Sequence, residues 1–438
     1  MTQTHYSRTQ LRRAVLSSYL GSVIEYYDFL LYATASAVVF NKVFFSNLDP
    51  LVGTVAAFGT LATGYFARPL GGIVFGHFGD RIGRKKMLVL SMTLMGVGST
   101  LIGVLPTYAQ IGVWAPILLV LLRVVQGIAV GGEWGGAVLM SAEHASSRRG
   151  LWASFTNAGA PSGVVLSTLV LAASASLSGE EAFLAWGWRI PFLLSVVLLA
   201  IGLFVRARVA ETPVFTEAAA NKPTAPPLLE VLRHHPRNLL LSIGVGFGAF
   251  VAQGTITTFL ISYAVQAGFP RPTVLNALTL SSFVAIFGII GYSALSDRVG
   301  RKPVVIAGAT AMAGYAFLLF PMVDSGSTLL LTLAIILGQG VIHPAWYGPL
   351  AALYTELFST GSRYTGASLG YQIAGLGGGI APLVFASVLA SGGSTTTVAI
   401  IIAAGCVLCI GCILALRETS TGDLTNDPEV AAAAPGNS

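Results

Sequence analysis

Twelve long apolar runs divide this chain of 438 residues, and short polar segments separate them. Each run is long enough to cross a hydrocarbon layer of roughly 30 Å as a helix, at about 1.5 Å per residue. Only 10% of the residues are charged, whereas soluble domains carry roughly 25%. The pattern predicts an all-α integral membrane protein with twelve transmembrane helices. We expect these helices at residues 14–41, 51–77, 87–105, 115–141, 151–176, 188–208, 238–265, 273–295, 303–322, 328–355, 364–390 and 395–416.

The basic residues predict how the chain crosses the membrane. If the chain starts in the cytoplasm, all lysines and arginines near a membrane face except Lys42, Arg189 and Arg271 fall on the cytoplasmic side. Cytoplasmic loops carry the excess of Lys and Arg. We therefore expect a multi-pass protein of the cytoplasmic membrane of a bacterium, with both termini cytoplasmic. The net charge of +6 reflects this topology, so the lipid bilayer is a predicted partner and nucleic acid is not.

A charged string occurs twice, as GHFGDRIGRKK at Gly76–Lys86 and as SALSDRVGRK at Ser293–Lys302. Each copy forms a predicted loop between the second and third run of a set of six, and internal repeats of this kind are typical of transporters. We therefore predict two pseudo-symmetric six-helix halves. The predicted parts are an N-terminal half at 1–208, a proline-containing cytoplasmic linker at 209–237, a C-terminal half at 238–416 and a disordered cytoplasmic tail at 417–438.

Five ionisable residues lie at membrane depth: Glu25, Asp28, Arg68, Arg123 and Glu133. Each costs at least about 2.5 to 3.5 kcal/mol there, so such residues pair with each other or serve a function. We predict Asp28 or Glu133 as the proton carrier and Glu25 as the third candidate, because burial favours the protonated carboxyl. Helical rise places Arg68 and Glu133 at one level, where we expect them to pair or communicate. The alternative is that these charges form permanent buried pairs that fix helix registry.

The two buried arginines, Arg68 and Arg123, carry guanidinium groups suited to a substrate carboxylate. Gln126 follows Arg123 by one helical turn, and Tyr26 and Tyr32 supply hydroxyl groups nearby. All five are candidate substrate-binding residues. The alternative for Arg123 is that it neutralises a carboxylate of the first run whatever the substrate is.

Four further strings carry a family resemblance. They are EYYDF at Glu25–Phe29, RPLGG at Arg68–Gly72, RVVQGIAVGGEWGG at Arg123–Gly136 and WGWRIPF at Trp186–Phe192. With the twelve runs and the repeated string, they resemble the major facilitator superfamily and, within it, the metabolite:proton symporter group. The pattern is most similar to the shikimate carriers of that group, which also includes carriers of dicarboxylates, citrate, and betaine or proline.

The resemblance implies the major facilitator fold and a secondary active transporter, not an enzyme. The implied activity is proton-coupled uptake of a small carboxylate-bearing metabolite, such as shikimate or a dicarboxylate, by alternating access. One alternative is betaine or proline symport with protons. Another is drug/proton antiport, because Gly159, Pro161 and Gly163 in the fifth run faintly resemble an antiporter pattern. We expect a monomer whose partners are the metabolite and the proton, with no cofactor and no metal.

The resemblance also implies that the cavity is lined by the first, fourth, seventh and tenth helices. This makes Gln253, Gln339 and His343 candidate substrate contacts in the second half. A packing role is the alternative for His343, which precedes Pro344.

Finally, the resemblance gives the repeated string a role as a cytoplasmic gate. Its aspartate is expected to face the end of a helix in the other half, where the helix dipole and basic residues hold the cytoplasmic side shut. The predicted gate residues are Asp80, Arg81, Gly83, Arg84 and Glu143 in the first half and Asp297, Arg301 and Glu356 in the second. The alternative is that these basic loops only set the topology.

Overall fold

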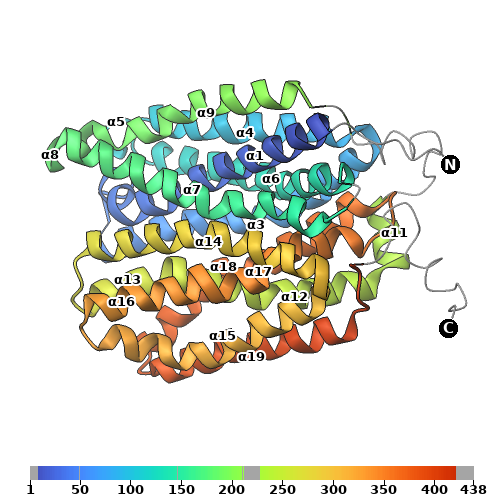
Figure 1. The fold of residues 1–438 in the computed structure, drawn as a ribbon. Coiled ribbons are helices and arrows are strands. Elements are labelled where there is room, and N and C mark those ends of the chain that lie inside the picture. Colours follow the sequence, from blue (N-terminus) through green and yellow to red (C-terminus); the bar gives the residue numbers. More distant parts are fainter. Residues whose placement is uncertain (1–7, 49, 146, 210, 212–226, 421–438) are drawn as a thin grey trace, which may run out of the picture.

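The computed structural model describes the chain except for residues 1–7, 49, 146, 210, 212–226 and 421–438. Regular structure in the described residues is entirely helical. Ten helical segments of this part are long and apolar enough to cross a membrane. Helices α1 (Arg8–Ala35) and α3 (Pro50–Ile82) run alongside them in the same bundle and complete the twelve (Figure 1). The predicted all-α fold of twelve membrane helices is confirmed.

The first half contains six long helical segments with short elements between them. In chain order they are α1 with η1 (Ser36–Phe40) and α2 (Asn41–Val43), α3, α4 (Arg84–Val104), α6 (Trp114–Glu143), α7 (Arg149–Ser178) and α9 (Arg189–Ala207). The short elements are α5 (Tyr108–Ile111), α8 (Glu180–Ala182) and the π-helical turn η2 (Phe183–Gly187).

The second half repeats this order after a short helix, and two of its long segments contain π-helical turns. Its elements are α11 (Pro227–His234), α12 (Pro236–Gly254) with η3 (Thr255–Phe259) and α13 (Leu260–Gln266), α14 (Arg271–Val299), α15 (Arg301–Asp324), α16 (Thr328–Ile335) with η4 (Ile336–Ile342) and α17 (His343–Glu356), α18 (Arg363–Ala390) and α19 (Thr395–Ala415).

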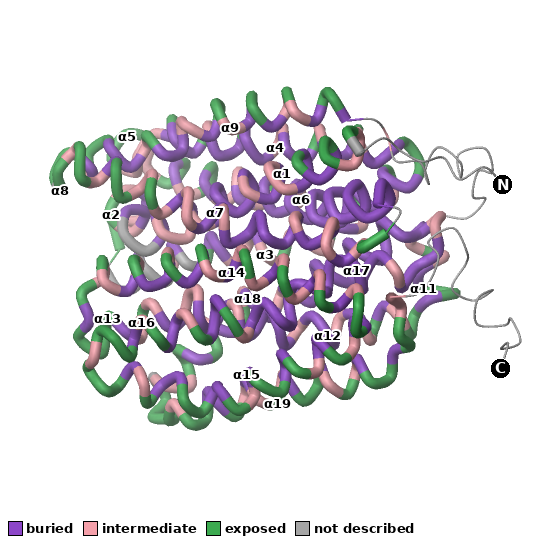
Figure 2. The backbone as a smooth tube through the Cα atoms, viewed as in Figure 1, coloured by how far each residue is buried: buried purple, intermediate pink, exposed green. Residues whose placement is uncertain are grey.

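The two halves lie side by side, with the blue-to-green helices above the yellow-to-red ones in Figure 1. Helix α7 packs against α14, and α3 packs against α18, so the halves meet along two seams. Buried residues concentrate between the halves, and exposed residues lie at the periphery (Figure 2). Helix α1 begins and α19 ends at the same end of the bundle. We call this the predicted cytoplasmic end and the opposite one the predicted outer end.

The repeated string is not the loop that the sequence predicts. Helix α3 continues to Ile82 and α14 to Val299, and a single glycine joins each of them to the next helix. Gly83 has a φ of 118° and Gly300 a φ of 100°. A side chain is strained at such angles, so these glycines permit a sharp turn between two nearly continuous helices.

Close packing within the first half depends on glycines of α3 and α6. A Cβ atom on Gly71 would overlap the backbone oxygen of Ile128, and one on Gly131 would overlap that of Arg68. Small residues allow membrane helices to approach closely in this way. The packing fixes the relative positions of the helices that carry Arg68, Arg123 and Glu133.

The predicted linker and tail fall only partly on described residues. Helix α11 lies inside the predicted linker, and residues 210 and 212–226 lie outside the described part. At the start of the predicted tail, Glu418 and Thr419 make hydrogen bonds to the second half. Its remainder, 421–438, is also outside the described residues.

Candidate functional site

A small cavity lies between the two halves, with a volume of about 40 Å³, which is room for a few water molecules. Residues of both halves line it, and some of them belong to the π-helical turns η3 and η4. Such turns are often found at functional sites. The lining residues are Tyr26, Phe29, Leu30, Tyr65, Arg68, Ala160, Pro161, Val164, Phe250, Gln253, Gly254, Thr257, Thr258, Gln339 and Gly378. Four predicted substrate residues are therefore at the cavity: Tyr26, Arg68, Gln253 and Gln339.

Arg68 and Arg123 share one aromatic neighbour. The Phe29 ring centroid lies 4.6 Å from the Arg68 guanidinium carbon and 4.9 Å from that of Arg123. Arg68 also lies 4.5 Å from the Tyr65 ring, and Arg123 lies 4.3 Å from the Tyr32 ring. Phe29 thus separates Arg123 from the cavity, while Arg68 reaches it.

The Arg123 guanidinium has few polar partners for a group that is 2% exposed. Its Nη1 donates a long hydrogen bond of 3.4 Å to Gln126, whose amide donates to Ser99 at 2.8 Å. Among the described residues its Nε has no acceptor. A buried cation with this much unused donor capacity can accept an anion when the site opens.

Asp28 is buried next to the Arg123 guanidinium. Its Oδ1 accepts a hydrogen bond of 2.6 Å from Ser195, and within the described part of the chain its Oδ2 has no donor. Tyr32 donates to Thr60 at 2.6 Å. Asp28 and Tyr32 therefore lie behind the cavity wall with Arg123.

Glu133 does not pair with Arg68, contrary to the expectation from helical rise. It forms a bidentate ion pair with Arg206 of α9 and accepts a hydrogen bond of 2.6 Å from Ser91. Depth along a helix gives the level of a side chain but not its direction, and here α9 supplies the nearer cation. Arg206 stands near the end of its apolar run, where the sequence predicts a residue at the membrane face, so this partner was missed.

Glu25 lies on α1 one turn after Gly21, which packs against Arg206 and Glu133. It is 5% exposed, and its Oε2 has no donor among the residues that the structure describes. Of the predicted carboxylates, Glu25 thus lies near the Arg206–Glu133 ion pair but is not part of it.

Three tyrosines close the cavity toward the predicted cytoplasmic end. The Tyr347 and Tyr371 hydroxyls are 2.6 Å apart, and Tyr26 lies 3.3 Å from Tyr371 and 3.4 Å from Tyr347. Trp134 stacks on Tyr371 with ring centroids 3.5 Å apart, and Asn157 donates to the Tyr347 carbonyl at 2.9 Å. These contacts join the two halves beneath the cavity.

His343 does not line the cavity. Its Nε2 lies 3.2 Å from the Ala249 carbonyl, and its ring stacks on Tyr347 at a centroid distance of 5.3 Å. The geometry agrees with the alternative of a packing residue.

The first copy of the repeated string caps a helix of the other half. Asp80 accepts hydrogen bonds from the backbone N–H groups of Tyr364 at 3.3 Å and Thr365 at 3.0 Å, and from the Thr365 hydroxyl at 2.9 Å. These groups lie in the first turn of α18, where N–H groups lack partners and the helix dipole favours an anion. We call this contact the first seal.

Basic residues extend the first seal across the seam. Glu143 forms ion pairs with Arg84 of its own half and, at 3.4 Å, with Arg363 of the other. Arg81 is exposed and has no ion pair in the described part of the chain. Arg363 begins α18. It was not predicted as a gate residue, because the sequence marks it only as one of the basic residues that set the orientation.

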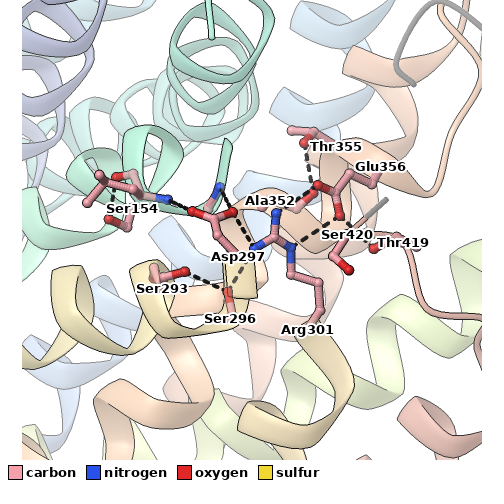
Figure 3. Close-up of polar contacts among 12 residues, drawn as sticks. Ser154, Ser293, Ser296, Asp297, Arg301, Ala352, Thr355, Glu356, Thr419 and Ser420 are labelled. Atoms are coloured by element: carbon pink, nitrogen blue, oxygen red, sulfur yellow. Dashed lines mark hydrogen bonds and ion pairs between the residues drawn. The ribbon is translucent and has the colours of Figure 1, made fainter. Parts of the chain in front are cut away.

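The second copy repeats the arrangement with the halves exchanged: its aspartate lies in the second half and caps a helix of the first (Figure 3). Asp297 accepts hydrogen bonds from the backbone N–H groups of Gly150 and Leu151, both at 2.8 Å, in the first turn of α7. Arg301 pairs with Asp297 at 2.8 Å and with Glu356 at 3.1 Å. We call the contact of Asp297 with α7 the second seal.

Two glutamates that were not predicted as gate residues extend this pseudo-symmetry. Glu211, after α9, accepts from the Lys85 N–H at 3.1 Å, and Glu418, after α19, accepts from Arg301 N–H at 2.8 Å and Lys302 N–H at 3.1 Å. Burial acts to raise the pKa of Glu418, but the backbone hydrogen bonds outweigh it and lower this pKa. A repeated Glu-Thr pair, shortly after the last helix of each half, was the available signal.

The arrangement is therefore a central cavity between two duplicated halves, closed at the predicted cytoplasmic end by reciprocal seals. The family model described as Major Facilitator Superfamily matches residues 19–382. The chain belongs to the major facilitator superfamily. The predicted family is confirmed.

Relatives place this major facilitator protein among transporters rather than enzymes. It is 39% identical over 422 residues to the shikimate transporter of Escherichia coli, covering 94% of this chain and 96% of that protein. It is also 34% identical to a glycine betaine/proline/ectoine/pipecolic acid transporter of Dickeya dadantii, over 86% of this chain and 77% of that protein. The structure of a proton:xylose symporter matches with a TM-score of 0.75 at 18% identity, over 94% of this chain and 97% of that one, which shows the shared fold.

Proposed function

We propose that this major facilitator protein takes up a small carboxylate-bearing metabolite together with protons, by alternating access. The observation that carries the proposal is Arg68 at a cavity between two halves, which the hydrogen bonds of Asp80 and Asp297 join at the predicted cytoplasmic end. Binding at the interface of two repeats, with rocking of one repeat against the other, is the mechanism that such folds support.

Arg68 is the proposed first contact of the substrate carboxylate. Tyr26, Gln253 and Gln339 surround it with hydroxyl and amide groups, and the buried Gln339 Oε1 has no donor among the described residues. Polar groups of this kind fix the orientation of a polar solute. The cavity must expand to hold a metabolite, and Arg123 with Gln126 would join the site once Phe29 moves.

Substrates with a quaternary ammonium group fit this geometry less well. Such ligands bind over aromatic faces, but the Arg68 guanidinium already lies over the Phe29 and Tyr65 rings. The carboxylate that betaine shares with organic acids finds a cation at this place, so only the ammonium group of betaine is disfavoured. We therefore favour an organic acid over betaine, although a betaine transporter is among the relatives.

The glycines that suggested antiport have a packing role. Side chains on Gly159 and Gly163 would collide with the backbone of α1 near Tyr19, Val23 and Tyr27. Their absence lets α7 lie against α1. This explanation is independent of the direction of transport.

Asp28 is the proposed proton carrier, with Glu25 second and Glu133 third. Asp28 is 1% exposed and lies beside Arg123 without an ion pair in the described part of the structure. A substrate anion that binds Arg123 would remove the positive field that favours the Asp28 carboxylate, and so link proton and substrate binding. Glu133 ranks last because Arg206 neutralises it.

Transport by the purified chain tests the proposal. Proteoliposomes with an imposed inward proton gradient are given labelled shikimate, 2-oxoglutarate, citrate or glycine betaine. Accumulation of shikimate, 2-oxoglutarate or citrate, abolished by a protonophore and by Arg68→Gln, is expected. Uptake of betaine alone would support osmolyte transport instead. Extrusion of hydrophobic cations without any uptake would contradict the proposal that the protein is an importer.

A further inference from the structure

A second hollow lies far from the central cavity, at the predicted outer end of the first half. It is an open groove of about 600 Å³ at the corner where α4, α5 and α9 meet, on the side of the bundle away from the second half (Figure 1). We call it the Arg189 groove. Its lining residues are Gly103, Val104, Pro106, Gln110, Ile111, Trp186, Arg189 and Leu193.

The Arg189 guanidinium is held in a fixed position in this groove. Its Nη1 donates to the carbonyl oxygens of Gly103 at 2.9 Å and Leu105 at 2.8 Å, and the group stacks on the Trp188 ring at 4.5 Å. These carbonyls end α4, so Nη1 serves as a cap for that helix. A guanidinium has five N–H donors, and among the described residues only Nη1 has acceptors, so the donors of Nε and Nη2 are available for a ligand.

The surroundings match a phospholipid rather than a soluble anion. Val104 is 57% exposed and Trp186 is 56% exposed, so apolar surface adjoins the cation. Trp114, 62% exposed, begins the neighbouring α6. Exposed tryptophans gather at the level of lipid head groups, which places Arg189 at the depth of lipid phosphates.

The charges of the groove also select among lipids. Arg189 is its only charged lining residue in the described part of the chain. A guanidinium binds phosphate oxygens in a bidentate manner. Within the described residues, no carboxylate lines the groove to receive the ammonium group of a zwitterionic head.

We propose that the Arg189 groove binds a glycerophospholipid with an anionic head group, such as phosphatidylglycerol, through its phosphate. Arg189 holds the phosphate, and Val104, Leu193 and Trp186 contact the glycerol and upper acyl chain. The WGWRIPF string thereby gains a role that the transport site does not explain. The site is independent of the proposed substrate and of proton coupling.

Native mass spectrometry of the full-length protein in detergent, titrated with phosphatidylglycerol or phosphatidylcholine, tests this proposal. Wild type is expected to retain phosphatidylglycerol about fivefold more strongly, the scale of one basic residue at an anionic lipid surface. Arg189→Gln is expected to abolish this preference. The matched control is Arg271→Gln, which removes another basic residue of the predicted outer end and should keep it.

Val104→Trp separates lipid binding from the capping role of Arg189. The indole fills the groove but leaves the bonds from Arg189 to the end of α4, so this variant should lose the preference even if Arg189→Gln fails to fold. An unchanged preference in a folded Arg189→Gln protein, or in Val104→Trp, would overturn the proposal. Equal stabilisation by soluble glycerol phosphate would also overturn it, because the groove would then be a site for free phosphates.

Discussion

Arg206 and Glu133 form a bidentate ion pair between α9 and α6, and each side chain is 2% exposed. Removal of one partner leaves the other charge buried and unpaired, which costs about 3 to 5 kcal/mol. We therefore expect Glu133→Gln to lower the free energy of unfolding by this amount in detergent, measured by tryptophan fluorescence. The double variant Glu133→Gln with Arg206→Met should recover most of the loss. If Glu133→Gln alone is as stable as wild type, the pair has no structural role.

Asp28→Asn removes the proposed proton carrier while keeping the size of the side chain. Proton-driven accumulation should be abolished, whereas exchange of labelled for unlabelled substrate across the membrane should continue, because exchange needs no net proton movement. Both are measured in proteoliposomes. Ser195→Ala, which removes only the hydrogen bond of 2.6 Å to Asp28, is the control and should retain accumulation. Unchanged accumulation in Asp28→Asn would rule out this residue as the carrier.

Phe29→Ala should admit the substrate to Arg123. The ring contacts both the Arg68 and the Arg123 guanidinium groups and lines the cavity, which Arg123 does not, so its removal should place two cations at one enlarged cavity. We expect the ratio of dicarboxylate to monocarboxylate uptake to rise about tenfold, as one added bond to a charged group supplies roughly 1.5 kcal/mol or more. Phe250→Ala enlarges the cavity from the other half and should leave the ratio unchanged. A ratio that rises equally in both variants would show an effect of volume alone.

Asp80→Asn weakens the first seal and should favour opening at the predicted cytoplasmic end. The loss of a charged helix cap costs about 0.5 to 2 kcal/mol, enough to shift the population between conformations. Spin labels are placed at the exposed positions Lys86 and Arg298, one in each half. Double electron–electron resonance then reports the opening as a longer distance between the two labels. Arg81→Gln alters the adjacent exposed residue and should give the wild-type distance distribution. The same distribution in Asp80→Asn would argue against a gating role.

Glu418 should make stability depend on pH in the acid range. Its folded-state pKa is lowered, so its contribution is fully present above the ordinary glutamate pKa of about 4.3 and is lost as the pH falls through the folded value. Glu418→Gln should therefore reduce stability at pH 7 by less than about 1 kcal/mol, because the carboxylate is exposed and screened.

The difference between Glu418→Gln and wild type should shrink toward zero near pH 3, as followed by thermal unfolding. The exposed Glu181 at the other end of the bundle provides the control, and Glu181→Gln should match wild type at both pH values. A difference for Glu418→Gln that stays constant with pH would mean that charge is not the cause.

The sequence predicted what depends on order along the chain. Apolar runs of membrane length led to the twelve helices, and the duplicated string located Asp80 and Asp297, since each copy stands at the same place in its half. The Arg206 partner of Glu133 and the Tyr26, Tyr347 and Tyr371 cluster were not predicted. They depend on how each helix rotates about its axis, and rotation is fixed by packing between segments that are distant in sequence.

Each seal joins an aspartate of one half to a helix start of the other, and this has a consequence for biogenesis. The ribosome completes α7 before it synthesises Asp297. The N–H groups of Gly150 and Leu151 therefore lack this acceptor until the second half is inserted. The start of α18 finds Asp80 already in place. The first half can thus enter the membrane early, but its final structure depends on the later synthesis of its own duplicate.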